Sequence, residues 1–230
     1  MEEALASMVD HVAARLAAKE HEVGGGRLLV GICGIPGSGK SSVARKLIEG
    51  VDGGRSSVVV GMDGWHLTRE ALSQMDDPKE AFAKRGAPWT FDAEAYAAFV
   101  DRVRNSDNRE TLEAPSFSHA VKDPVPGDTK VEPHHRLVVF EGLYCNVDEG
   151  AWRSAAEKLD ERWLVSVDES EAKRRLVERH VLTGVAKDHE EAIWRANNND
   201  LPNGRYLLEH LLEPVRRIPS INDDAWAGEG

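Results

Sequence analysis

Continuous apolar runs alternate with helical patterns along most of the chain. The apolar runs lie at Leu28–Cys33, Val58–Met62, Leu137–Phe140 and Trp163–Val167. Apolar residues in an unbroken run are typical of strands that are covered on both faces, as in a parallel sheet. The helical patterns between them lie at Ser41–Gly50, Asp92–Arg104 and Glu169–Leu182. This order predicts an α/β fold, a doubly wound and mostly parallel sheet that binds ligands at the carboxyl ends of its strands.

An octapeptide between the first predicted strand and the first of these helices carries the clearest chemical signal. Gly34-Ile35-Pro36-Gly37-Ser38-Gly39-Lys40-Ser41 matches the phosphate-binding P-loop at every specified position, in the strand, loop, helix context that the motif requires. Its glycines allow backbone N–H groups to turn inward around a polyphosphate, at the positive end of the helix dipole. Lys40 would reach the β- and γ-phosphates, and the Ser41 hydroxyl would bind Mg²⁺. The octapeptide and Ser42 therefore predict a nucleoside triphosphate site.

Acidic residues follow two other predicted strands. Asp63 follows Val58–Met62, where its carboxylate would accept the proton of an attacking hydroxyl or help to hold Mg²⁺. Because Asp-Gly is a common turn pair, an ordinary turn is the alternative for Asp63. Glu141 follows four apolar residues, a position that packing explains poorly, and is a second candidate for the Mg²⁺ shell.

Composition limits the classes of partner. The net charge of −11 argues against a general binder of nucleic acid or anionic membranes, which usually carries a basic patch or tail. Cys33 and Cys145 suit a reduced compartment better than a disulfide framework. No apolar run approaches the roughly 20 residues of a membrane span, and the acidic start of the chain is unlike a signal peptide. These features predict a soluble, cytoplasmic protein.

A basic helix face lies between Glu171 and His180, in an otherwise acidic chain. One interpretation is a solvated helix whose Glu and Arg side chains pair at spacings of three and four. The other is a lid that places Arg174, Arg175 or Arg179 on a transferring phosphate and excludes water. Charge alone leaves both interpretations open.

Together these residues resemble the P-loop kinases of the uridine kinase, phosphoribulokinase and pantothenate kinase superfamily, over most of the chain after residue 26. Asp63-Gly64-Trp65-His66 resembles the turn of that group whose aspartate is the catalytic base. Glu141-Gly142-Leu143-Tyr144 is similar to a run in uridine and pantothenate kinases, and Arg174–Arg179 falls where the superfamily has its arginine-bearing lid. The resemblance implies a P-loop NTPase fold of the nucleoside and nucleotide kinase type, with ATP and Mg²⁺ as cofactors.

Within the superfamily, three segments are similar to bacterial and fungal kinases described as uridine kinase-like or pantothenate kinase-like: Met62–Arg69, Lys84–Asp92 and Asn199–Gly204. Pro115–Asp123 resembles the pantothenate kinase stretch that lines the acceptor site. Phe117 stands where a tyrosine is common, and Gly64-Trp65-His66 replaces the aromatic residue and tyrosine that usually follow the uridine kinase aspartate. These departures leave phosphoryl transfer intact but weaken the case for uridine or pantothenate as the acceptor.

The resemblance supplies most candidates for the acceptor pocket. They are Trp65, His66, Arg85, Trp89, Asp92, Phe117, His119, Tyr144, Asn199, Asp200 and Asn203. Arg85 would hold an anionic or hydroxylated group, and Trp89 would wall the pocket. The alternatives stay open: an ordinary turn anchored by Trp89, histidines that are satisfied polar groups, and a helix end followed by a turn at 201–204.

Two functions follow from these observations. The first is a kinase that uses Mg²⁺ and ATP to phosphorylate a hydroxyl of a small metabolite, such as a nucleoside, a pantothenate-like alcohol or a sugar. The second is a regulatory P-loop NTPase that hydrolyses nucleotide to switch a partner. For the kinase, the catalytic candidates are Lys40, Asp63, Arg174, Arg175 and Arg179, and the metal candidates are Ser41, Glu141 and Asp63.

The predicted organisation is a single P-loop kinase domain over residues 1–230. An amphipathic helix within 1–23 ends before Gly24-Gly25-Gly26. Residues 65–133 are too long for a plain connection and are interpreted as an acceptor-binding insertion, and 169–204 as the lid and the segment after it. The expected partner is a small acceptor molecule, without nucleic acid or membrane, and the chain is expected to be a monomer or a homodimer.

Overall fold

The central element is a parallel sheet of five strands in the order β2-β5-β1-β6-β7. The computed structural model describes residues 2–20 and 26–220, so the predicted break at Gly24 and Gly25 lies outside the described residues. The strands are β1 (Leu28–Cys33), β2 (Ser57–Gly61), β5 (Leu137–Glu141), β6 (Glu161–Ser166) and β7 (Arg216–Pro219). All four pairings are parallel, which confirms the predicted doubly wound fold.

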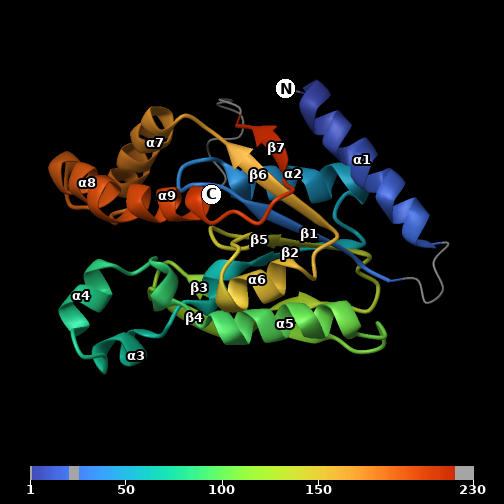
Figure 1. Ribbon diagram of the computed structural model, residues 1–230, viewed down its shortest axis with the longest axis horizontal. Coiled ribbons are helices and arrows are strands. Elements are labelled where there is room, and N and C mark those ends of the chain that lie inside the picture. Colours follow the sequence, from blue (N-terminus) through green and yellow to red (C-terminus); the bar gives the residue numbers. More distant parts are fainter. Residues whose placement is uncertain (1, 21–25, 221–230) are drawn as a thin grey trace.

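Helices cover both faces of this sheet (Figure 1). α1 (Glu2–Glu20) and α2 (Lys40–Asp52) pack on one face, where Met8, Val12 and Leu47 are fully or almost fully buried. α5 (Ala93–Asn105) and α6 (Gly150–Ala156) cover the other face. Strands covered in this way have to be apolar throughout, and every residue of β1 is buried. None of the described helices combines the length and the hydropathy that a membrane span requires.

Three helices and a π-helical turn cluster beyond the end of β6 (Figure 1). α7 (Glu169–Leu182) contacts α8 (His189–Arg195), and a π-helical turn, η3 (Ala196–Asp200), leads into α9 (Leu201–Glu209). The interpretation of 201–204 as a turn is wrong, because these residues form the first turn of α9. Pro202 is tolerated there, since the first N–H groups of a helix have no partner within the helix.

The stretch 65–133 is more ordered than its proline content suggests. It contains α3 (Arg69–Ser73), α4 (Pro78–Ala83), the 3₁₀ turn η2 (Pro88–Thr90) and α5. An antiparallel hairpin follows, β3 (Leu112–Ser118) and β4 (Asp123–Val131), which the sequence did not predict. Its prolines are compatible with strands because the sheet has only two strands and its register shifts at Pro115.

Candidate active site

Three neighbouring strands bring the predicted nucleotide-binding, metal-binding and catalytic residues to one edge of the sheet. β5 lies between β1 and β2, and its last residue, Glu141, pairs with Ile32 of β1 and Gly61 of β2. The P-loop follows β1, and Asp63 lies in the short 3₁₀ turn η1 (Met62–Trp65) that follows β2. Since parallel strands end at the same edge, the P-loop, Glu141 and Asp63 form a line along it.

The P-loop backbone has the shape of an anion cradle. Gly37 and Gly39 have φ angles of 82° and 85°, in the left-handed region that glycine adopts without strain. Gly39 is the N-cap of α2 and provides no side-chain cap, so the first N–H groups of this helix remain available to an anion. The Ser38 hydroxyl is buried and has no hydrogen-bond partner among residues 2–20 and 26–220. These features fit the polyphosphate of a nucleotide.

Lys40 and Glu141 face each other at the start of α2. Lys40 Nζ lies 4.0 Å from Glu141 Oε1, and the two side chains are 17% and 14% exposed. Burial raises the pKa of Glu141, and Asp63 adds to the increase, whereas Lys40, a hydrogen bond from Ser41 and Arg179 oppose it. A largely buried carboxylate beside a hydroxyl is a ligand pair suited to Mg²⁺, which prefers oxygen ligands.

The described residues contain no group of three or more His, Cys, Asp or Glu side chains arranged to hold a metal by themselves. This agrees with a P-loop site, where Mg²⁺ takes one hydroxyl and few carboxylates and completes its shell with phosphate and water oxygens. Ser41 and Glu141 carry the oxygen donors that such an ion takes, and their assignment to Mg²⁺ stays a prediction.

Asp63 is exposed at the end of β2 and is held through its backbone. Its carbonyl oxygen accepts hydrogen bonds from the His66 backbone N–H at 3.1 Å and from His66 Nδ1 at 2.9 Å. Gly64 packs against β3 so closely that a Cβ at this position would lie 2.1 Å from the Pro115 carbonyl oxygen. The turn is fixed from both sides, which leaves the carboxylate free to face a ligand.

The arginines of α7 differ in their surroundings. Arg174 is paired with Glu171 and Glu178 at 2.8 Å each and is 54% exposed. These contacts agree with the interpretation of a solvated helix with paired Glu and Arg side chains. Arg179 is exposed and forms no ion pair among the described residues, and its charge lowers the pKa of Glu141. Arg179 is therefore an α7 arginine whose charge acts on Glu141.

Several acceptor candidates have structural roles. Trp65 is buried in the core, with its ring 5.2 Å from that of Tyr96, so the ring does not face a ligand. Asp92 caps α5 by accepting a hydrogen bond from the Ala95 N–H at 2.9 Å.

The Arg85 guanidinium donates to the carbonyls of Leu67 and Lys122 and pairs with Asp123. Arg85 thus joins the loop before η2 to the β3–β4 hairpin, and the sequence did not predict this clamp.

Other candidates form an aromatic surface next to Asp63. The His66 ring lies 4.0 Å from that of Phe91 and 4.9 Å from that of Phe117, and Phe117 contacts His119 edge-on at 5.4 Å. Burial lowers the pKa of His66, although the nearby Asp63 opposes this effect. His66, Phe117 and His119 are therefore brought together beside Asp63.

The remaining polar candidates mostly bind one another. The Tyr144 hydroxyl donates to the Gly86 carbonyl at 2.7 Å, and the Asn199 amide donates to the Arg85 carbonyl at 2.9 Å. Asn203 donates to Asn199 at 3.4 Å, and His180 pairs with Asp200 at 2.9 Å. The Asn199 contact docks η3 on the loop that carries Arg85, and the His180–Asp200 pair joins η3 to α7.

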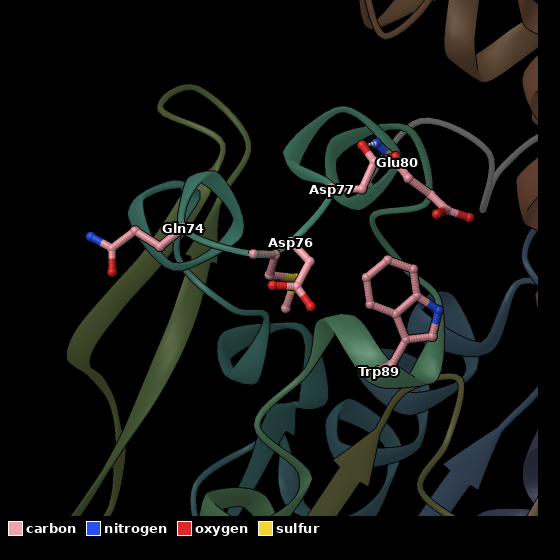
Figure 2. Close-up of a pocket in the computed structure, with 6 residues that line it drawn as sticks. Gln74, Asp76, Asp77, Glu80 and Trp89 are labelled. Carbon is pink, nitrogen blue, oxygen red and sulfur yellow. Dashed lines mark hydrogen bonds between the residues drawn. The ribbon is translucent and has the colours of Figure 1, made fainter.

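Trp89 lies apart from this group. It is 48% exposed and lines an open hollow of about 450 Å³ together with Gln74, Met75, Asp76, Asp77 and Glu80. Figure 2 shows its indole ring facing the segment that carries these carboxylates. Asp63 does not line this hollow, so the structure does not join Trp89 to the line of strand ends.

One residue at the P-loop was missed by the sequence. Ser220, which follows β7, donates its hydroxyl hydrogen to the Ser38 carbonyl at 2.7 Å and accepts from Arg175 at 2.9 Å. β7 contains the polar run Arg216-Arg217 and ends in a proline, so it gives no apolar pattern from which a strand could be predicted. The contact exists because β7 pairs with β6.

The fold and this edge of the sheet define a P-loop nucleotide-binding protein of the kinase type. The chain belongs to the phosphoribulokinase / uridine kinase family, whose profile matches residues 29–178. Family membership implies a phosphotransferase that uses ATP.

Individual relatives agree with this assignment. The chain is 37% identical over 191 residues to a Schizosaccharomyces pombe protein named "Putative uridine kinase", with 82% of this chain and 81% of the relative covered. It is 41% identical over 160 residues to "ATP-dependent kinase-like protein notR'" of Aspergillus versicolor, covering 69% and 93%. The fold matches a "putative fructose transport system kinase" from Silicibacter sp. TM1040 with a TM-score of 0.80 and 30% identity, covering 93% and 98% of the two chains.

Proposed function

We propose that this chain transfers the γ-phosphoryl group of Mg²⁺-bound ATP to a hydroxyl of a small metabolite. The observation that carries the proposal is the line of Lys40, Glu141 and Asp63 on three neighbouring strand ends, beside an uncapped helix N-terminus. A cation, a metal-binding carboxylate and a second, exposed carboxylate are the groups that phosphoryl transfer to a hydroxyl requires. In this assignment, residues 65–133 provide the acceptor surface and 169–204 the lid.

Each residue has a separate task in this proposal. The P-loop N–H groups and Lys40 hold the β- and γ-phosphates, and Ser41 and Glu141 hold Mg²⁺. When bound, the ion neutralises charge on the phosphate oxygens. Asp63 orients the acceptor hydroxyl and takes its proton. Arg179, whose charge already reaches Glu141, closes over the transferred group and excludes water.

The acceptor would lie against the surface formed by His66, Phe117 and His119. This surface is adjacent to Asp63 and has aromatic faces with imidazole nitrogens between them. Such a surface suits an uncharged molecule with hydroxyl groups and an apolar or planar face. The names of the relatives refer to uridine and fructose, so nucleosides and sugars come first in a panel of acceptors, followed by pantothenate-like alcohols.

The Asp63→Asn variant tests the proposal. We expect turnover to fall about 10²- to 10⁴-fold, the usual contribution of a general base, while ADP binding changes little. Asp107→Asn, at an exposed carboxylate in a loop, is the matched control and should retain full activity.

Product analysis separates the two candidate functions. A kinase converts the acceptor to its phosphate ester, in amounts equal to the ADP formed. Release of inorganic phosphate alone, with every acceptor in the panel, would instead indicate a regulatory NTPase. Unchanged turnover in Asp63→Asn with weakened ADP binding would contradict the role of Asp63 as base.

A further inference from the structure

Two carbonyl groups of the P-loop are bound from outside the loop. The Gly37 carbonyl accepts a hydrogen bond from Arg175 at 3.2 Å, and the Ser38 carbonyl accepts one from the Ser220 hydroxyl at 2.7 Å. Neither donor comes from β1, β2 or β5, because Arg175 lies on α7 and Ser220 follows β7. The P-loop is thus held on the side opposite to Glu141 and Asp63.

These bonds control the direction of the peptide groups. In a trans peptide the C=O and the N–H of the same plane point in opposite directions. When Ser220 holds the Ser38 carbonyl, it therefore also fixes the direction of the Gly39 N–H on the other side of that plane. Gly39 has a φ of 85° and caps α2 without a side-chain hydrogen bond. The peptide between Ser38 and Gly39 therefore depends on few contacts besides that with Ser220.

The two donors form one network. Arg175 donates to the Ser220 hydroxyl at 2.9 Å and to Glu171 at 2.9 Å, and its side chain is 21% exposed. Ser220 is itself placed by the sheet, because its N–H donates to the Ser166 carbonyl at 2.7 Å at the end of β6. A single hydroxyl thus accepts from Arg175 and donates to the P-loop.

α7 also contacts the loop directly. A Cβ on Gly37 would lie 2.6 Å from the Ala172 carbonyl oxygen, so the first turns of α7 and the P-loop backbone are in close contact. Arg175 is therefore anchored at a short distance from the loop that it binds. Its contacts differ from those of Arg174, which pairs with exposed glutamates, and of Arg179, which acts on Glu141.

We propose that Ser220 and Arg175 are positioning residues for the nucleotide: Ser220, held by Arg175, fixes the Ser38 peptide so that the Gly39 N–H faces the phosphates. The Gly37 peptide is held on both sides, because its carbonyl accepts from Arg175 and the Ser38 N–H donates to the Ile35 carbonyl at 3.0 Å. The inference rests on the proposed function, since it assumes that the loop binds ATP. It assigns Arg175 to the support of the loop rather than to the lid. It also gives β7, the last strand of the sheet, a role in nucleotide affinity.

The test compares ADP binding in Ser220→Ala, Ser220→Thr and the wild type, by isothermal titration calorimetry. Ser220→Ala should weaken ADP binding about five- to tenfold, the effect of one lost hydrogen bond, and raise the KM for ATP more than it lowers kcat. Ser220→Thr keeps the hydroxyl and should stay within about twofold of the wild type in ADP affinity. Ser73→Ala, on exposed α3, controls for the loss of a serine hydroxyl elsewhere.

A double-mutant cycle with Arg175→Gln tests the shared network. Because Arg175 is bonded to the hydroxyl through which Ser220 acts, the losses in ADP affinity should be non-additive. Additive losses, or an Ser220→Ala protein that binds ADP as the wild type does, would overturn the inference while the kinase assignment stands. A failure of Ser220→Thr to restore binding would also overturn it. Absence of ADP binding by the wild type would instead contradict the proposed function itself.

Discussion

The two sides of β1 differ in what they bring to the P-loop. On one side, β5 and β2 end in Glu141 and the Asp63 turn, whose carboxylates remain available to a ligand. On the other side, β6 and β7 lead to Arg175 and Ser220, whose donors are bound to P-loop carbonyls. The residues on the first side are suited to chemistry and those on the second to support. A P-loop therefore depends on neighbours that make no contact with the reacting atoms.

After Asp63→Asn, the largest effect is expected at Lys40, between the two sides. Lys40→Ala should lower acceptor-dependent ATP consumption roughly 10²- to 10³-fold, because it removes the cation next to the phosphates. A coupled assay for ADP measures this loss, with Lys46→Ala as the control, since Lys46 is partly exposed and pairs only with Glu49 among the described contacts. A Lys40→Ala protein with the normal acceptor-dependent rate would contradict the assignment of the site.

Two arginines of α7 sharpen the comparison. Arg179→Gln should lower kcat by at least about tenfold, since the variant lacks a charge directed at the developing phosphate charge. Arg174→Gln should change kcat less than about twofold, because exposed ion pairs of this kind contribute little. Steady-state kinetics at saturating ATP measures both. Equal losses in the two variants would show that the position of Arg179 relative to Glu141 has no special importance.

A smaller effect is expected where the Asp63 turn packs on β3. Gly64→Ala places a Cβ 2.1 Å from a backbone oxygen and should lower the free energy of unfolding by about 1–3 kcal/mol, the usual cost of overpacking. Gly61→Ala is the matched control, because a Cβ at Gly61 meets nothing within 4 Å. Urea denaturation measures both variants. If Gly64→Ala were as stable as Gly61→Ala, the turn would not be held as tightly as the structure indicates.

The smallest effect concerns the cost of keeping Glu141 ionised. Folding raises the pKa of Glu141 above its ordinary value of 4.5, so the protonated form is favoured in the folded state. This contribution to stability is present below pH 4.5 and is lost as the pH rises through the raised pKa. Glu141→Gln imitates the protonated form, and without nucleotide it should unfold at a higher temperature than the wild type at pH 7.

Thermal unfolding of nucleotide-free protein between pH 4.5 and 8 measures this difference, which should decrease toward the acidic end. Glu110→Gln, at an exposed position, should show no such trend. A wild type that is more stable than Glu141→Gln at pH 7 would show that the Lys40 contact outweighs the cost of burial.

The sequence predicted those elements that are marked by a pattern of residue types within the element itself. The apolar runs of β1, β2, β5 and β6 and the P-loop glycines indicate their structure within a few residues, since strands buried on both faces are mostly apolar and positive φ favours glycine. The β3–β4 hairpin was not predicted, because its prolines argue against strands unless the sheet has free edges.

For the candidate site, the sequence by itself determined the residue types and their places at strand ends: Lys40, Ser41, Asp63 and Glu141. The tertiary structure alone decided which of the candidate side chains are available to a ligand. It used Asp92 as a helix cap, Arg85 as a clamp and Trp65 in the core, and it brought Ser220 to the P-loop across 182 residues. Hydrogen bonds between distant segments depend on strand order and register, and no local pattern of residues records either.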